Sequence, residues 1–223
     1  MKLYSGPLSL FSRKVEIALS EKGVAFERVM VPFTQERGYQ PKHPDVLAAN
    51  PKGQVPVLVD GDFTLFDSTL IFEYLEEAYP TPPLMPKGAV ARAQCRMMEL
   101  RADEVVFPHA RTFFYRTDPP HPDPARRAAD EEAGARAEAA LRDHFTALAE
   151  ILGRRDFLCG DLSCADIAMF MTVLWTQRLK GPSIRDYPAL AAWYDRLRAR
   201  PPFGKAAAEI AAADRELTRP IGN

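Results

Sequence analysis

The chain has 223 residues, a length that suits one large domain or two small ones. Its 29 Lys and Arg residues nearly balance its 30 Asp and Glu residues, so no electrostatic nucleic-acid surface is expected. No apolar run approaches the roughly 18 residues of a membrane span, and the start Met1-Lys2-Leu3-Tyr4 has no apolar signal region. We therefore expect a soluble, cytoplasmic protein that binds neither nucleic acid nor a membrane.

Metal chemistry is not expected from the cysteines or the histidines. Cys95, Cys159 and Cys164 lack the spacing of metal ligands, and their number does not indicate a disulfide framework. The four histidines are scattered along the chain: His43, His109, His121 and His144.

Residues 1–79 alternate short strands with helices in the order βαβ, a short α, then ββα. The first helix begins at Ser9 or Ser12 and ends at Gly23, and because it links two strands, those strands should lie parallel. Asp60-Gly61-Asp62 is typical of a hairpin turn. The expected strands are 2–4, 26–31, 57–59 and 63–65, and two further helices are expected at 44–49 and 68–79.

Four prolines within seven residues follow and predict a stiff, extended linker at 80–88. The linker would separate a first domain at 1–79 from an all-helical second domain at 89–223. Helices in that second domain are expected at 89–113, 125–152, 163–177, 187–200 and 203–217. Ser163 and Asp166 match a capping box at the start of an apolar helix, and we assign both to folding.

The segment before the third strand carries an unusual proline. Pro56 opens the strand, where a missing N–H costs no ladder hydrogen bond, and the Val55–Pro56 bond is a candidate cis peptide. A cis bond would leave the backbone N–H and C=O of Val55 free to pair with an added extended peptide. The alternative is a trans turn that opens a hairpin.

Asp67 and Ser68 open the helix that follows the hairpin. The free N–H groups of a helix start attract a carboxylate, and the carboxylate of Asp67 suits an amine. A ligand with an amine and a carboxylate at one end would fit this corner. Alternatively, Asp67 and Ser68 only cap the helix.

Together these segments resemble the glutathione transferase superfamily over nearly the whole chain. The first part is similar to its thioredoxin-like domain, with Pro56 at the cis-proline position and Asp67-Ser68 at the place of an acidic-or-Gln plus Ser pair. Ser163 and Asp166 resemble the capping box of its all-helical second domain. The resemblance implies an α/β thioredoxin-like N-terminal domain and an all-α C-terminal domain.

The resemblance also implies a glutathione site in the first domain, with glutathione as co-substrate and no metal. The backbone of Val55 would pair with the cysteinyl part, and Asp67 and Ser68 would hold the γ-glutamyl end. Lys42 lies in a segment similar to one of tau-class members, where the Lys pairs with the glycyl carboxylate; Gln54 would contribute at the same end. A solvated loop lysine is the alternative for Lys42.

The chemistry of this superfamily needs the glutathione thiol as a thiolate. A free thiol has a pKa of about 8.5, and lowering it by about 2 units takes about 2.7 kcal/mol. A hydroxyl donor at a helix N-terminus can supply that stabilisation. Ser9 is our candidate: Ser9-Leu10-Phe11 is similar to the Ser-Pro-Phe opening of many members, with Leu10 in place of Pro. The rival hydroxyls are Tyr4, Ser5 and Ser12, and the alternative role for Ser9 is only to cap the first helix.

The second substrate would be an apolar electrophile bound between the domains. Candidate lining residues are Leu10, Phe33, His109, Phe113, Phe114 and Tyr115. The resemblance further implies a homodimer. We thus expect a glutathione transferase; the alternatives are a non-catalytic interaction protein, as in the stringent starvation protein branch, or a glutathione-dependent isomerase, whose Ser-Ser-Cys type opening Ser9-Leu10-Phe11 does not reproduce.

Overall fold

The computed structural model describes residues 1–40 and 42–221 and divides into two compact units. The first unit contains Met1–Met85 together with Pro201–Leu217. The second unit contains Pro86–Arg200 and the end of the chain. The last helix thus groups with the N-terminal part, and the domain boundaries at 79 and 89 stay a prediction.

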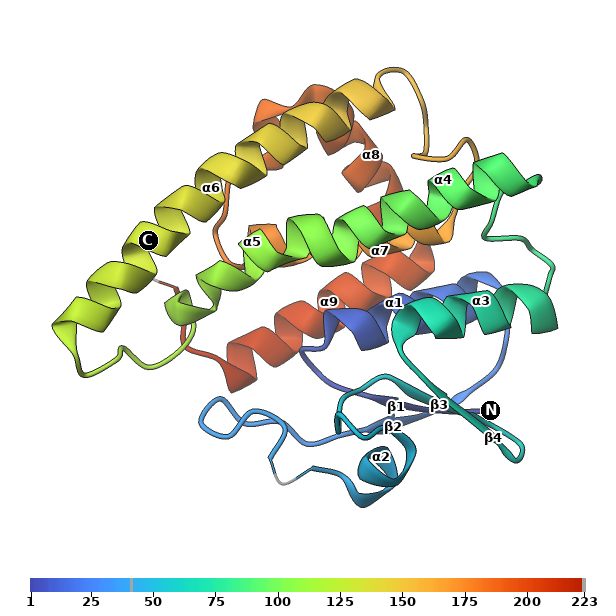
Figure 1. Cartoon of the computed structure of the whole chain (residues 1–223), viewed down its shortest axis with the longest axis horizontal. Helices are drawn as coiled ribbons and strands as arrows, with labels where there is room; N and C mark the ends of the chain where they lie inside the picture. The colour runs from blue at the N-terminus through green and yellow to red at the C-terminus, as the bar shows by residue number, and fades with distance from the viewer. Residues whose placement is uncertain (41, 222–223) are drawn as a thin grey trace. The chain divides into compact units, whose positions relative to one another are not determined.

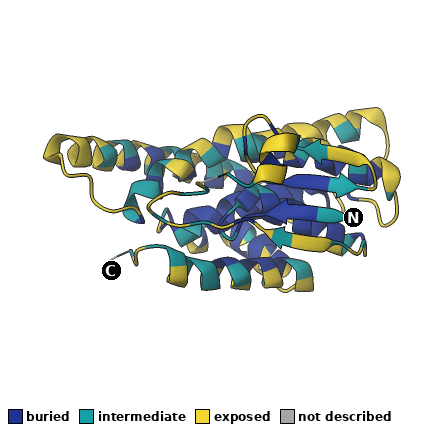
Figure 2. Cartoon of the chain, turned by 90° about the horizontal axis from the view of Figure 1, so that it is seen from below, coloured by how far each residue is buried: buried dark blue, intermediate teal, exposed yellow. Residues whose placement is uncertain are grey.

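A four-stranded mixed sheet forms the centre of the first unit, in the order β2-β1-β3-β4. Its strands are β1 (Lys2–Ser5), β2 (Glu27–Met30), β3 (Val57–Asp60) and β4 (Phe63–Phe66). β1 and β2 are parallel, as predicted from the crossover helix, and β3 is antiparallel to both β1 and β4. Figure 2 shows the central strands mostly dark blue and the edge strands mostly yellow and teal.

Helices cover both faces of this sheet (Figure 1). One face packs against α1 (Leu10–Glu21) and α3 (Ser68–Ala78), and the other packs against the short α2 (Pro44–Ala49). Because side chains alternate along a strand, Tyr4 and Val57 join the α2 side while their neighbours Leu3 and Leu58 face α1 and α3. The α/β thioredoxin-like architecture is therefore confirmed.

The second unit is helical throughout its regular structure. Its α-helices are α4 (Ala89–Leu100), α5 (Phe107–Arg111), α6 (Pro124–Leu152), α7 (Cys164–Arg178) and α8 (Pro188–Arg198). Every residue from Cys164 to Thr176 in α7 is buried, so this helix forms the core around which the others pack. The last helix of the chain, α9 (Pro201–Leu217), belongs to the first unit.

The single helix predicted at 89–113 is wrong in detail. The helical path continues from α4 into a π-helical segment, Arg101–Val106, then into α5 and a 3₁₀ turn, Thr112–Arg116. Pro108 explains the change, because it has no N–H to donate to the carbonyl of Glu104 and its ring crowds the preceding turn. A widened π turn accommodates that break without ending the helix.

Asp166 organises the start of α7, and the predicted capping box is confirmed. Its Oδ2 accepts from the N–H and the hydroxyl of Ser163, at 3.0 and 2.7 Å. Its Oδ1 accepts from the N–H of Leu158 and from Nε1 of Trp193, both at 2.9 Å. Burial raises the pKa of Asp166 although all four donors favour its charged form. One carboxylate therefore joins the 158–163 loop, α7 and α8.

We predict that Asp166→Ala lowers the free energy of unfolding by about 3 kcal/mol or more, because it leaves several buried donors unpaired. Urea unfolding followed by circular dichroism measures the loss. Asp143→Ala, on an exposed position of α6, is the matched control and should change stability by about 0.5 kcal/mol or less. Equal stability of the two variants would contradict this role of Asp166.

Candidate functional site

The strand register gathers three loops at one end of the sheet in the first unit. Tyr4 near the end of β1 pairs with Val57 at the start of β3, and Val57 pairs with Phe66 at the end of β4. The turn after β1, the loop before β3 and the start of α3 therefore lie together. We call this group of residues the sheet-end site; it comprises Ser9, Gln54, Val55, Pro56, Asp67 and Ser68, with Lys42 beside it.

Ser9 is the N-cap of α1 and is partly exposed. Its Oγ accepts from the backbone N–H of Ser12 at 3.2 Å and from the hydroxyl of Ser12 at 3.0 Å. A serine hydroxyl has two acceptor positions and one O–H donor. Both acceptor positions of Ser9 are occupied, so its O–H is left to donate to a ligand.

The three other candidate hydroxyls each donate a hydrogen bond within the protein. Tyr4 donates to Oδ2 of Asp45 at 2.5 Å, and this hydrogen bond, together with burial, raises the pKa of Tyr4 to about 12. Ser5 is fully buried and donates to Oε1 of Glu16. Ser12 is fully buried and donates to Ser9. Among these four hydroxyls, Ser9 alone combines access with an uncommitted donor.

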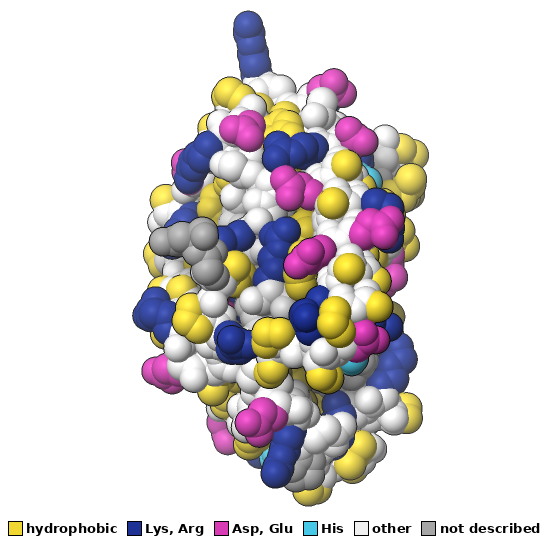
Figure 3. All heavy atoms as spheres, turned by 90° about the vertical axis from the view of Figure 1, so that its left-hand side faces the viewer, with side chains coloured by type: hydrophobic (Ala, Val, Ile, Leu, Met, Phe, Trp, Pro, Cys, Tyr) yellow, Lys and Arg dark blue, Asp and Glu magenta, His cyan; other side chains and the backbone are white. Residues whose placement is uncertain are grey.

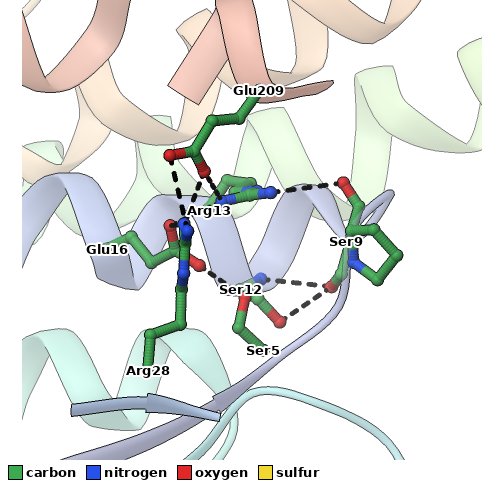
Figure 4. A network of polar contacts seen from close by, with 8 residues as sticks. Ser5, Ser9, Ser12, Arg13, Glu16, Arg28 and Glu209 are labelled. Carbon is green, nitrogen blue, oxygen red and sulfur yellow. Dashed lines mark hydrogen bonds and ion pairs between the residues drawn. The ribbon is translucent and has the colours of Figure 1, made fainter. Parts of the chain in front are cut away.

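A partly buried polar network supports the turn that carries Ser9 (Figure 4). The side chain of Arg13 is 2% exposed, and its Nη1 lies 2.7 Å from Glu16 and 2.6 Å from Glu209 of α9. Its Nη2 donates to the carbonyl of Pro7 at 3.5 Å, between β1 and Ser9. Arg13 thus ties the turn to both α1 and α9.

Arg28 of β2 completes the charge balance of this network. Its Nη1 lies 3.0 Å from Glu16 and 2.5 Å from Glu209, so two guanidinium groups face two carboxylates. Burial by itself raises the pKa of Glu209, but the hydrogen bond from Arg28 and the charge of Arg13 outweigh it and lower that pKa. Glu209 is therefore ionised at neutral pH and holds α9 to the site.

The Val55–Pro56 bond is cis, as expected, and the loop before it is held by Asn50. Asn50 is 3% exposed. Its Nδ2 donates to the carbonyl of Gln54 at 2.8 Å, and its Oδ1 accepts from the N–H of Lys52 at 3.0 Å. Asn50 was not among the site residues predicted from the sequence; its position at the start of the turn-forming segment Asn50-Pro51-Lys52-Gly53 was the available signal. A second cis bond, Thr81–Pro82, was not predicted.

The Val55 backbone lies open beside this loop. Within 1–40 and 42–221, neither its N–H nor its C=O is hydrogen-bonded to another residue. Lys42 lies nearby: a Cβ added to Gly53 would come within 3.3 Å of Cγ and Cδ of Lys42. The aliphatic part of Lys42 therefore packs on the turn that leads into Gln54 and Val55.

Asp67 adopts a backbone conformation that is costly for a residue with a side chain, with φ 78° and ψ 125°. Its Oδ1 accepts from the N–H groups of Thr69 and Leu70, at 3.0 and 3.4 Å. The capping role considered for Asp67 is thus present. Asp67 is an exposed residue and both of these bonds use Oδ1, so Oδ2 can still accept from an amine; Ser68 beside it is 5% exposed.

The residues proposed to line a second-substrate pocket are found in both units. Leu10 is buried and Phe33 is partly exposed in the first unit. In the second unit, His109 and Tyr115 are partly exposed, whereas Phe113 is fully buried in the core. Phe114, the sixth candidate, is partly exposed in the second unit, and a common pocket formed by the six side chains stays a prediction.

Metal-binding clusters, membrane-spanning helices and surface charge are three further features of the described residues. Among residues 1–40 and 42–221, no group of three or more His, Cys, Asp or Glu side chains is arranged to hold a metal ion. Over the same ranges, no helix has both the length and the apolar character that crossing a bilayer requires. On the face shown in Figure 3, basic and acidic side chains are interspersed, in line with the balanced totals of 29 and 30.

The fold and the site define a thioredoxin-like domain joined to a helical domain, and comparisons with known proteins identify the family. Residues 3–83 match the model of the glutathione S-transferase N-terminal domain, and residues 97–201 match that of its C-terminal domain. Glutathione S-transferase 3 of Zea mays is 33% identical over 222 residues, which cover 94% of each chain. The chain belongs to the glutathione S-transferase superfamily.

Two further relatives show the range of this family. The stringent starvation protein A homolog of Coxiella burnetii is 43% identical over 105 residues, which cover 46% of this chain and 46% of that protein. This match therefore spans about half the length of that relative. The structure of a sphingomonad glutathione S-transferase complexed with glutathione has a TM-score of 0.75 and 28% identity, covering 95% of this chain and 99% of that one.

We predict that Asn50→Ala lowers the free energy of unfolding by about 1–3 kcal/mol, because the loop before Pro56 loses two partly buried hydrogen bonds. Urea unfolding measures the change. Lys52→Ala keeps the backbone N–H that Asn50 binds and should unfold like the unmodified protein. If Asn50→Ala were equally stable, its side chain would not hold the loop.

Proposed function

We propose that this protein is a glutathione transferase that activates the glutathione thiol with Ser9 and directs it to an apolar electrophile. The observation that carries the proposal is the hydrogen bonding of Ser9, whose two acceptor positions are filled and whose donor is uncommitted. The donor sits at the positive end of the 12-residue helix α1, where a thiolate is favoured.

The rest of the sheet-end site suits the tripeptide part of glutathione. The open N–H and C=O of Val55 would pair with the cysteinyl backbone as an added strand does. Oδ2 of Asp67 would accept from the γ-glutamyl amine, and the start of α3 with Ser68 would bind its carboxylate. Lys42 and Gln54 would hold the glycyl carboxylate. The sphingomonad relative complexed with glutathione supports this ligand.

In the proposed reaction the glutathione thiol first loses its proton to solvent water, and Ser9 donates a hydrogen bond to the resulting thiolate. The sulfur then forms a bond with an electrophilic carbon. The electron pair of the broken bond leaves with the departing group or moves into the conjugated system of the substrate. Ser9 lowers the free energy of the thiolate and is not consumed.

We predict that Ser9→Ala raises the pKa of the bound glutathione thiol by up to about 2 units and lowers kcat/KM roughly 20- to 100-fold at neutral pH. The ultraviolet absorbance of the thiolate against pH measures the first effect, and conjugation of a chloronitrobenzene measures the second. Ser9→Thr keeps the hydroxyl and is the matched control. An unchanged thiol pKa in Ser9→Ala would remove Ser9 from the reaction.

A non-catalytic interaction protein is the second candidate, because the stringent starvation protein A homolog matches this chain at 43% identity over 105 residues. Such a protein would keep the fold with weak glutathione binding or none. Family membership also supports our proposals of a homodimer and of a cytoplasmic location.

Isothermal titration calorimetry with glutathione separates the two candidates. For a transferase we expect measurable binding that Asp67→Asn weakens about tenfold or more, because a charged hydrogen bond to the amine is lost. Asp62→Asn, an exposed carboxylate on the β3–β4 turn, is the matched control and should bind like the unmodified protein. If glutathione produced no heat of binding and did not raise the melting temperature of the protein in a thermal-shift assay, the non-catalytic interaction protein would be favoured.

A further inference from the structure

Ser12 of α1 binds the side chain of Ser9 twice, which is more than a helix cap requires. The backbone N–H of Ser12, the third residue of α1, donates to Oγ of Ser9 at 3.2 Å, and this is the ordinary hydrogen bond of a serine N-cap. The hydroxyl of Ser12 donates to the same oxygen at 3.0 Å (Figure 4). The second bond fills the acceptor position of Ser9 that the cap leaves over.

The hydroxyl of Ser12 serves Ser9 and nothing else in the described part of the chain. Ser12 is 0% exposed, and over residues 1–40 and 42–221 its hydroxyl makes no other hydrogen bond. Ser9 is partly exposed. A ligand at the sheet-end site therefore meets the hydroxyl of Ser9 and not that of Ser12, so any effect of Ser12 on the ligand passes through Ser9.

The two bonds from Ser12 fix the direction of the O–H bond of Ser9. A hydroxyl oxygen has its bond to carbon, two acceptor positions and one O–H, and the hydrogen rotates to suit its surroundings. With Cβ and the two donors of Ser12 in place, rotation leaves a single direction for the hydrogen of Ser9. A donor whose direction is set in advance needs no reorganisation when charge develops on the sulfur.

The hydroxyl of Ser12 also makes Ser9 a stronger donor. Hydrogen bonds in a chain polarise one another, and each neighbour strengthens a bond by about 10–30%. A thiolate can only accept, so its binding sets the direction of the chain from Ser12 through Ser9 to the sulfur. The negative charge that the anion induces on Oγ of Ser9 is then stabilised by a buried O–H donor.

We propose that Ser12 is a positioning residue, which acts through Ser9 to stabilise the glutathione thiolate. This inference rests on the proposed function, because it needs Ser9 as the donor to the sulfur. An aliphatic residue at position 12 would keep the cap, whose hydrogen bond comes from the backbone N–H. It would lose the bond that orients and polarises the hydroxyl of Ser9.

The test is a double-mutant cycle in the full chain, read by the ultraviolet absorbance of the bound glutathione thiolate against pH. Ser12→Ala should raise the thiol pKa by about 0.5 unit, about a quarter of the largest shift expected for Ser9→Ala, and lower kcat/KM about threefold at neutral pH. The double variant Ser9→Ala/Ser12→Ala should have the thiol pKa of Ser9→Ala, because without Ser9 the hydroxyl of Ser12 has no path to the sulfur.

A matched control separates this role from a general effect on the helix. Ser20→Ala, at an exposed position of α1, should leave both the thiol pKa and kcat/KM unchanged. If Ser12 only supported the packing of α1, Ser12→Ala would lower the melting temperature of the protein without moving the thiol pKa.

The cycle also distinguishes a failure of this inference from a failure of the proposed function. If Ser9→Ala raises the thiol pKa but Ser12→Ala does not, Ser9 keeps its role and Ser12 has none. If the two shifts add in the double variant, Ser12 acts by a route other than Ser9, and the inference is wrong. If Ser9→Ala itself leaves the thiol pKa unchanged, the proposed function fails and the role of Ser12 fails with it.

Discussion

The register of β3 between β1 and β4 is the constraint on which the candidate site depends. It places the end of β1, the start of β3 and the end of β4 side by side, with Val57 paired to both Tyr4 and Phe66. A shift of one residue would turn Val57 out of the core and move the Val55 backbone away from the starts of α1 and α3. Packing of Tyr4, Val31 and Val57 against Val46 of α2 therefore fixes the site as well as the sheet.

A buried group of charges then joins that sheet end to the end of the chain. Arg13 is almost inaccessible, and a buried guanidinium is tolerable only when carboxylates and hydrogen bonds compensate for its lost hydration. Glu16 provides one partner from α1, and Glu209 provides the other from α9. The first unit is thus complete only with a helix that follows the whole second unit in sequence. The turn leading to Ser9 depends on that helix through the contact of Arg13 with Pro7.

The features predicted well from sequence are those with local signals. Hydrophobic periodicity and turn residues predicted the strands and most helices, and Asp67 and Ser163 cap helices as their residue types indicate. The contact between Arg13 and Glu209 spans 196 positions, and no spacing rule connects such residues. The contact of Cys95 with Cys164 was missed for the same reason, since these two residues meet only when α4 packs against α7. Pro108 did indicate an interruption of the helix, but the periodic apolar pattern around it predicts one continuous helix, so the π turn was not predicted.

The two roles considered for Ser9, capping and thiol activation, use different parts of one hydroxyl. The cap needs lone pairs that accept from Ser12, whereas a sulfur anion needs an O–H that donates. Aspartate would serve the cap but has no donor when ionised, and its charge would oppose a neighbouring thiolate. Alanine would lose both functions, so its effect on stability, about 1 kcal/mol for a lost cap, must be separated from its effect on the thiol. Serine and threonine alone satisfy both demands with a short side chain, which explains physically why a hydroxyl residue suits this helix start in the proposed reaction.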